Sequence, residues 1–408
     1  MLDSRTMIPC RRRAKRPRRP GDLPRTCEAR DWAGLGDGPA GLTAELALAS
    51  DVADYVRFRA VCQPWRRCSP DPRASGLDGR FLPRQWIMLD KAPAAAGPRR
   101  HRFLNLSTGE CIRMDLPQLA EHTLLTLTPE GLLLLLLAEP TLVVRLLNPL
   151  THQLTDLPPM MALLSPMQHE AWLRGFEIGI RNRKNGFIRV SGVGLVADAS
   201  TVSVAVSFYS PWLLAVATPG DESWTVIDKD YICSTLSFGG RVYCVPCGEV
   251  MVLKMGSEGQ QPPRLETVVD WSELFHFCPM AHSLHLVDNG GELMLVHRAL
   301  RLTDDKYHRE YDVYRVDLEA GVLVPTKSFN GRAVFMGMRR AISVSAEAAF
   351  PSLTADTIYL GRDWDGRAHE YNIVDGSKCN PTLDRSVCPS SIVDCLSYCI
   401  QGVGEELV

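Results

Sequence analysis

After about residue 80 the chain is a succession of short apolar runs, separated at intervals of about ten residues by Gly, Pro, Asn and Asp. Examples are RFLNLSTGECIRMDL, TLVVRLLNPLTHQLTDLPP, GRVYCVPCGEVMVLKM and YDVYRVDLEAGVLVP. Each predicts two strands joined by a tight turn. The turns fall at 107–109, 148–151 and 319–321, where the residue types tolerate turn geometry. Regular hairpins with few helix-period segments predict an all-β sandwich, barrel or propeller.

Two hairpin segments share a sequence. SFGGRVYCV at 237–245 and SFNGRAVFMG at 328–337 both contain S-F-x-G-R followed by an apolar strand. Self-similarity on this scale favours sheets repeated around an axis over a sandwich. At about 40 to 50 residues per blade, residues 81–380 predict a β-propeller of six or seven blades, with 381–408 as a C-terminal tail.

The first 30 residues differ in charge from the remainder. They carry 10 Lys/Arg and 3 Asp/Glu, which leaves 35 basic and 44 acidic residues elsewhere. Clustered arginine and proline predict a disordered basic leader over 1–30. The acidic remainder argues against nucleic acid as a partner. RRRAKRPRR is either a solvated tail or a nuclear import signal, and we expect a nuclear or cytoplasmic location. The import candidates are Arg11, Arg12, Arg13, Lys15, Arg16, Arg18 and Arg19.

Residues 31–69 have helical periodicity, and a proline-rich linker is predicted at 70–80. In DYVRFRAVCQPWR, the apolar side chains Tyr55, Phe58, Val61, Cys62 and Trp65 follow helical spacing and form one face. A segment of about 40 residues is too small to bury this face alone. It therefore packs against a partner protein or against the chain's own β domain.

Helix-breaking residues interrupt this segment. Gly38, Pro39 and Gly41 predict a first helix that begins late or frays. Pro64 predicts a kink or a new turn before Trp65.

The segment DWAGLGDGPAGLTAELALASDVADYVRFRAVCQPWRRCSP resembles the F-box of plant F-box proteins, most closely through R-x-V-C-x-x-W at 59–65. It departs from them where Leu35-Gly36 replaces the usual Leu-Pro. Farther along, LNPLTHQLTDLPP, FGGRVYC, YDVYRVDL and FNGRAVFMG resemble the plant KIB-type β-propeller domain that often follows such an F-box. The fold class expected is mainly β, with a small N-terminal α-helical F-box over 31–69 followed by the propeller.

The resemblance implies the substrate-recognition subunit of a Skp–cullin–F-box type E3 ubiquitin ligase, with the F-box on a Skp-type adaptor and the propeller on a client protein. The alternative is a non-ligase propeller scaffold or nuclear interaction protein with a degenerate F-box. A glycan hydrolase that uses a propeller face is a third alternative. The implied adaptor-binding residues are Leu35, Leu42, Leu46, Leu48, Val52, Tyr55, Phe58, Val61, Cys62 and Trp65.

Motifs for catalysis are missing from the sequence, which contains no G-x-x-x-x-G-K-[ST], G-x-S-x-G or H-E-x-x-H. We therefore expect no enzyme activity, catalytic residue, cofactor or metal. Cys244 and Cys247 in CVPC, and His282 and His285 in HSLH, have metal-like spacing. In a β-rich segment, core residues are the better interpretation.

An apolar run, GLLLLLLAEPTLVVRLL, is interrupted by Glu139, Pro140 and Arg145. It is too short for a membrane span and predicts two buried strands around a turn. The tryptophans are buried anchors or, where exposed, candidates for client contact. Those considered are Trp172, Trp212, Trp224 and Trp364.

Overall fold

The computed structural model describes residues 35–74, 76–89, 100–137, 142–170, 188–197, 201–256, 261–272, 282–303, 306–337, 340–346, 350, 353–360 and 369–379. The predicted basic leader and its import candidates, the C-terminal tail, Trp172 and Trp364 lie outside these residues.

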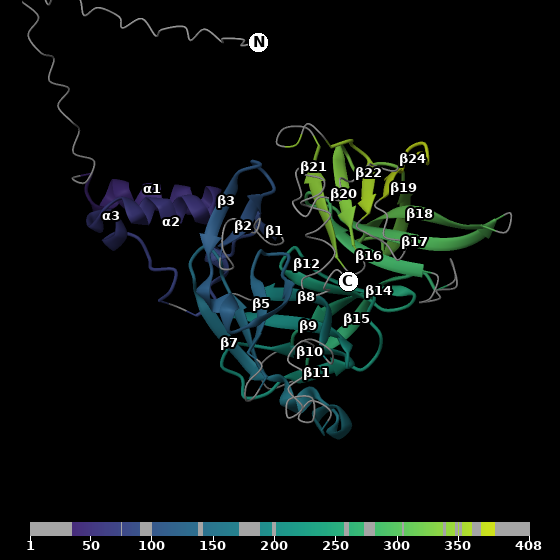
Figure 1. The fold of residues 1–408 in the computed structure, drawn as a ribbon, viewed down its shortest axis with the longest axis horizontal. Helices are drawn as coiled ribbons and strands as arrows, with labels where there is room; N and C mark the ends of the chain where they lie inside the picture. Colours follow the sequence, from purple (N-terminus) through teal and green to yellow (C-terminus); the bar gives the residue numbers. More distant parts are fainter. Residues whose placement is uncertain are drawn as a thin grey trace, which may run out of the picture.

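The strands form six sheets, which are the blades of a propeller (Figure 1). Blade 1 contains β1 (Trp86–Leu89), β2 (Arg100–Asn105) and β3 (Cys111–Asp115). Blade 2 contains β4 (Thr123–Leu127), β5 (Leu133–Leu137), β6 (Val143–Leu147) and β7 (Leu154–Pro159). Blade 3 contains β8 (Arg189–Ala197), β9 (Val202–Ser210), β10 (Trp212–Ala217) and β11 (Thr225–Asp228). Blade 4 contains β12 (Ser234–Phe238), β13 (Arg241–Val245), β14 (Glu249–Lys254) and β15 (Arg264–Asp270). Blade 5 contains β16 (His282–Asp288), β17 (Leu293–Thr303), β18 (Lys306–Asp317) and β19 (Val322–Thr326). Blade 6 contains β20 (Arg332–Met336), β21 (Ala341–Ser345), β22 (Thr357–Leu360), β23 (His369–Asn372) and β24 (Lys378–Cys379).

The predicted fold class is confirmed, and the blade number is six. Blades 2 to 5 are four-stranded antiparallel meanders, and the apolar run at 131–147 supplies β5 and β6, as predicted. Blade 1 has three strands among the described residues. Blade 6 has five in the order β21-β20-β22-β23-β24, with β20 and β22 parallel.

The ring closes through buried side chains. In the part of the chain that is described, no sheet combines strands from both ends of the propeller. Instead Phe335 and Val344 of blade 6 share one buried cluster with Trp86 and Phe103 of blade 1. The other neighbouring blades also meet in apolar clusters. Burial of such large side chains stabilises the closed ring without a shared sheet.

The outer hairpins of four blades share one turn, and three of the four are the predicted turns. Its first residue is Asn or Asp, whose side-chain oxygen accepts hydrogen bonds from the backbone N–H groups two and three residues later, and its fifth residue has a positive φ. Such side chains replace backbone partners in turns. The first and fifth residues are Asn105 and Gly109, Asn148 and His152, Asp317 and Gly321, and Asn372 and Gly376.

The S-F-x-G-R repeat marks a local turn, and its two copies have different places in the blades. At 237–241 it joins β12 to β13 within blade 4, whereas at 328–332 it leads from β19 of blade 5 into β20 of blade 6. In both copies the glycine before arginine has a positive φ, 75° at Gly240 and 77° at Gly331.

From residue 35 on, where the description begins, three α-helices precede the propeller: α1 (Asp37–Ser50), α2 (Val52–Val61) and α3 (Gln63–Arg67). The break predicted at Pro64 is confirmed, because Cys62 is extended and Pro64 lies in the first turn of α3. The predicted late start of the first helix is wrong. It begins before Gly38, and Pro39 lies in the first turn, where its missing N–H costs nothing. None of the helices described here has the length and apolar character to cross a membrane.

Candidate interaction surfaces

The apolar face of α2 is covered by the chain itself. Tyr55 is fully buried, and its ring lies 5.5 Å from that of Phe81, which precedes blade 1. Phe58 stacks on Trp65 of α3 at 4.6 Å. Ala40 and Ala44 of α1 complete this cluster, because their small side chains let α1 approach closely. The three helices therefore share a core with the segment that leads into the propeller.

The start of α2 is built into blade 1. Val52 and Ala53 belong to the cluster that contains Trp86. The Asp51 carboxylate accepts hydrogen bonds from the Ala53 backbone N–H at 2.7 Å, from Trp86 Nε1 at 2.9 Å and from Asn105 Nδ2 at 2.7 Å. Asp51 is therefore both the N-cap of α2 and a polar link to β1 and the end of β2.

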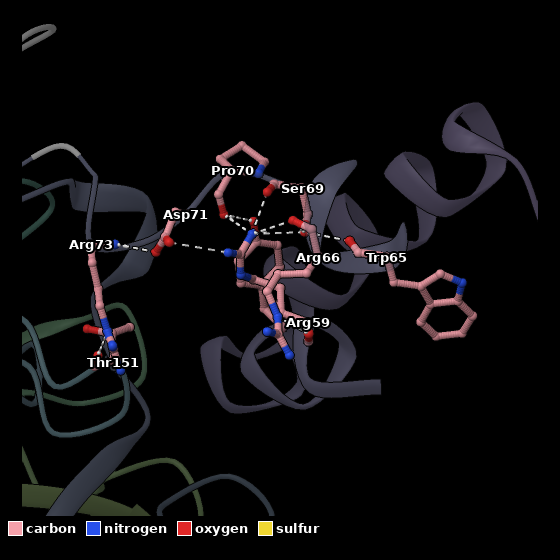
Figure 2. A network of polar contacts seen from close by, with 9 residues as sticks. Arg59, Trp65, Arg66, Ser69, Pro70, Asp71, Arg73 and Thr151 are labelled. Carbon is pink, nitrogen blue, oxygen red and sulfur yellow. Dashed lines mark hydrogen bonds and ion pairs between the residues drawn. The ribbon is translucent and has the colours of Figure 1, made fainter. Parts of the chain in front are cut away.

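Arg59 ties α2 to the segment that follows α3 (Figure 2). Its guanidinium is nearly buried and donates to the carbonyl oxygens of Arg66 at 3.1 Å and Pro70 at 2.7 Å, and to both oxygens of Ser69. Its Nη2 also lies 3.5 Å from Asp71 Oδ2. Several charge-assisted bonds to carbonyls fix this segment against α2.

The predicted linker is tied to both α2 and the propeller. The Pro70 carbonyl accepts from Tyr55 Oη at 2.6 Å, and Arg73 Nε donates to the Thr151 carbonyl of blade 2 at 2.7 Å (Figure 2). Arg57 of α2 forms an ion pair with Glu110, in the turn between β2 and β3. Helices, linker and blades 1 and 2 are thus connected at several points.

The predicted adaptor-binding residues fall into three classes of exposure. Val52, Tyr55 and Phe58 are buried by α1, the linker and blade 1, so the expectation that they face a partner is not met in this structure. The half-buried residues are Leu35, Leu48, Cys62 and Trp65. The exposed residues are Leu42 (70%), Leu46 (73%) and Val61 (61%).

A second candidate surface contains three aromatic rings at one end of blade 3. Trp212 is 57% exposed, and its ring lies 6.5 Å from that of Tyr209 and 5.8 Å from that of Tyr231. The Tyr209 and Tyr231 rings are 6.2 Å apart. Exposed aromatic residues of this kind are typical of binding hot spots. Trp224, by contrast, is a buried anchor whose Nε1 donates to the Pro158 carbonyl at 2.7 Å.

A cavity of about 880 Å³ lies at the centre of the propeller. Residues of the five innermost strands, β4, β8, β12, β16 and β21, line it. Ile87 of β1 also reaches it, because no described strand of blade 1 lies inside β1. This volume is within the usual range of small-molecule pockets. Its lining comes from all six blades, so no local sequence pattern predicts this cavity.

The two cysteines of CVPC do not form a paired site. Cys244 is buried in β13, and burial raises the pKa of its thiol to about 12. Cys247 is exposed, and the thiol beside it is that of Cys233. In HSLH, burial lowers the pKa of His285 to about 3. Within the described ranges, no three His, Cys, Asp or Glu side chains are grouped to hold a metal ion.

Comparison with known proteins identifies the propeller. The family model described as KIB1-4 beta-propeller matches residues 103–378, more than half of the chain. No curated protein matches this chain. Solved structures to which it is similar include that of the Dos1 propeller, with 10% identity and a TM-score of 0.28 over 71% of this chain and 66% of that chain. Another is Bacteroides ovatus Xyloglucan PUL GH43B, with 12% identity and a TM-score of 0.26 over 67% and 54%. This chain spans less than two thirds of the length of either solved structure. By the family model that matches residues 103–378, it belongs to the KIB1-4 β-propeller family.

Proposed function

We propose that the chain is a substrate-recognition subunit of a Skp–cullin–F-box type ubiquitin ligase and has no active site of its own. In this role the N-terminal helices contact a Skp-type adaptor through the exposed face of α1, and the propeller holds a client protein. The match of Arg59, Val61, Cys62 and Trp65 to the F-box pattern supports the first part. Membership of a propeller family is compatible with protein interaction in the second.

One observation carries the adaptor proposal. Leu42 and Leu46 are one turn apart on α1 and are 70% and 73% exposed, while Ala40 and Ala44 face the helical core. Two large apolar side chains on one exposed helix face are typical of a surface that docks into a partner's groove. We therefore place the adaptor on α1, with Val61 as a further exposed apolar residue.

The experiment is a calorimetric titration of the full chain with a purified plant Skp-type adaptor. Changing both Leu42→Glu and Leu46→Glu should weaken binding at least about a hundredfold, because burial of each leucine contributes roughly 1.5 to 3 kcal/mol. Val322→Glu is the matched control, because Val322 is also an exposed apolar residue, at 47%, but lies on β19 of blade 5. Its affinity should equal that of the parent.

The alternative is a propeller scaffold that does not bind the adaptor, and the same titration separates the two. No heat of binding with the parent chain would favour the scaffold and contradict the ligase proposal. If the leucine variant and the Val322→Glu control bind the adaptor with equal affinity, the adaptor does not contact α1 through Leu42 and Leu46.

The client side of the proposal rests on the Trp212 surface. Trp212→Ala should abolish co-purification of a ubiquitinated client when the proteasome is inhibited, without changing adaptor affinity. The control must be an exposed residue, which excludes Trp224, because Trp224 Nε1 is hydrogen-bonded inside the fold. Val226→Ala changes an exposed residue of the same blade instead. Unaltered client capture by Trp212→Ala would exclude this surface.

Nuclear entry is proposed for the basic leader on its composition alone, through the cluster at 11–19. A tagged chain without residues 1–25 should lose nuclear accumulation. If its distribution equals that of the full chain, the leader is not an import signal.

A further inference from the structure

The central cavity is lined by an excess of positive charge. Four arginines contribute to it, against two acidic residues, although the chain as a whole carries a net charge of −2. The arginines come from three different parts of the ring: Arg84 precedes β1, Arg189 begins β8, and Arg332 and Arg340 belong to blade 6. Charges of one sign on the walls of a cleft raise the local concentration of ligands of the opposite sign.

Arg332 is held in place by blade 6. Its Nε donates to Ser343 Oγ at 2.8 Å and its Nη2 to the Ser343 carbonyl at 3.1 Å. These bonds leave Nη1, which lies beside Gly290. Burial lowers the pKa of Arg332, against a smaller raising influence of the Asp288 carboxylate, so this cation has lost part of its hydration. An anion in the cavity would further stabilise this partly desolvated cation.

Arg340 also lines the cavity, beside the end of β21 that lies away from Arg332. It immediately precedes β21, and Ser343 follows it by three residues, or about 10 Å of strand. Arg84 and Arg189 are exposed in the cavity, and neither has an ion-pair partner among the residues described.

Two acidic residues, Glu130 and Asp288, also line the cavity, and the Asp288 charge acts on Arg332. Glu130 is 8% exposed and its Oε2 has no hydrogen-bond partner among the described residues. Burial raises the pKa of Glu130, because it penalises the charged carboxylate. The hydrogen bonds of Glu130 and the charge of Arg84 lower this pKa by less. Asp288 accepts a hydrogen bond from the Gly291 backbone N–H at 2.8 Å.

We propose that the central cavity is a binding site for a small, multiply charged phosphate compound, held by Arg84, Arg189, Arg332 and Arg340. Guanidinium groups suit phosphate because their paired N–H donors match two phosphate oxygens. A volume of about 880 Å³ inside a ring of strands is that of a small-molecule site, whereas a peptide would need an open groove. The proposal does not depend on the ligase role.

The test is calorimetric titration of the full chain with inorganic tripolyphosphate, at constant ionic strength set with sodium chloride. We expect one site per chain and an affinity that falls as salt is raised. Arg84→Gln and Arg189→Gln should each weaken binding about tenfold, and the double variant by more. Arg241→Gln is the matched control: Arg241 is the equivalent arginine of the other S-F-x-G-R copy and does not line the cavity. It should bind as the parent does.

Because Arg84 and Arg189 make no ion pair within the described residues, their variants should melt at the parent's temperature. A drop in melting temperature would call for the milder Arg84→Lys and Arg189→Lys, which should retain part of the affinity. No binding by the parent overturns the proposal, as do equal affinities of all three glutamine variants. Binding of a phosphoserine peptide but not of tripolyphosphate would also overturn it. The Leu42→Glu, Leu46→Glu variant should bind tripolyphosphate with the parent's affinity. The phosphate site and the adaptor contact are therefore tested separately, and one proposal can fail without the other.

Discussion

Asp51 carries three hydrogen bonds on one carboxylate, and its removal should destabilise the molecule more than any surface acid of the helices. Asp51→Ala removes the N-cap of α2, worth about 1 kcal/mol, and leaves Trp86 Nε1 and Asn105 Nδ2 without their acceptor. Each orphaned donor adds about 1 to 3 kcal/mol. We expect a loss of roughly 3 kcal/mol or more in the free energy of unfolding, measured by urea denaturation.

Asp54→Ala is the control, because Asp54 lies on the same helix and forms only an exposed pair with Arg57. Its removal should cost less than about 1 kcal/mol. Similar losses for both variants would show that the bonds from Asp51 to the propeller contribute little.

Glu130 makes stability depend on pH. Burial raises its folded-state pKa above the unfolded value, so between the two values the folded chain binds more protons than the unfolded chain. Stability must then fall as pH rises through that interval. Glu130→Gln keeps the shape of the protonated group without its titration. We expect this variant to melt above the parent at neutral pH, with the difference narrowing toward pH 4.5. A difference that is constant with pH would contradict this account.

At the scale of elements, α1 contains glycines that add no contact to the fold. A Cβ at Gly38 would meet nothing within 4 Å, and one at Gly41 would lie 3.7 Å from the Cys68 carbonyl, an ordinary contact. Gly38→Ala and Gly41→Ala should therefore stabilise the helix by up to about 1 kcal/mol each, less for Gly38 in the first turn. Gly36 differs, because its φ of 81° requires glycine. Gly36→Ala should destabilise, and thermal melts of the three variants would show the opposite signs. Stabilisation by all three would contradict the cap geometry.

The elements themselves were predictable where local chemistry fixes them. Asn148 in its turn, Pro64 at the start of α3 and the alternating apolar strands all act within a few residues of sequence. What covers α2 was not predictable, since Phe81 and Trp86 lie more than 20 residues away and a partner protein could equally have covered that face. The cavity and the strand order of blade 6 depend on how distant blades pack, and neither leaves a local pattern.

At the scale of the whole molecule, the helices and the propeller are one packed unit. Val52 and Ala53 share a cluster with blade 1, and Arg73 bonds to blade 2. The chain therefore presents the α1 face, with Leu42 and Leu46, while the α2 face is already occupied. A partner of the helices must accept them in this docked arrangement.

Hydrogen exchange of the full chain, alone and with the Skp-type adaptor, tests this account most directly. In the free chain the amides of α2 should exchange as slowly as those of blade 1, since both open only when their shared core opens. On adding the adaptor, new protection should appear in α1 and not in the buried part of α2 that contains Tyr55 and Phe58. Rapid exchange throughout α2 in the free chain, with protection gained only in the complex, would mean that the partner and not the propeller covers the α2 face, and would contradict the account.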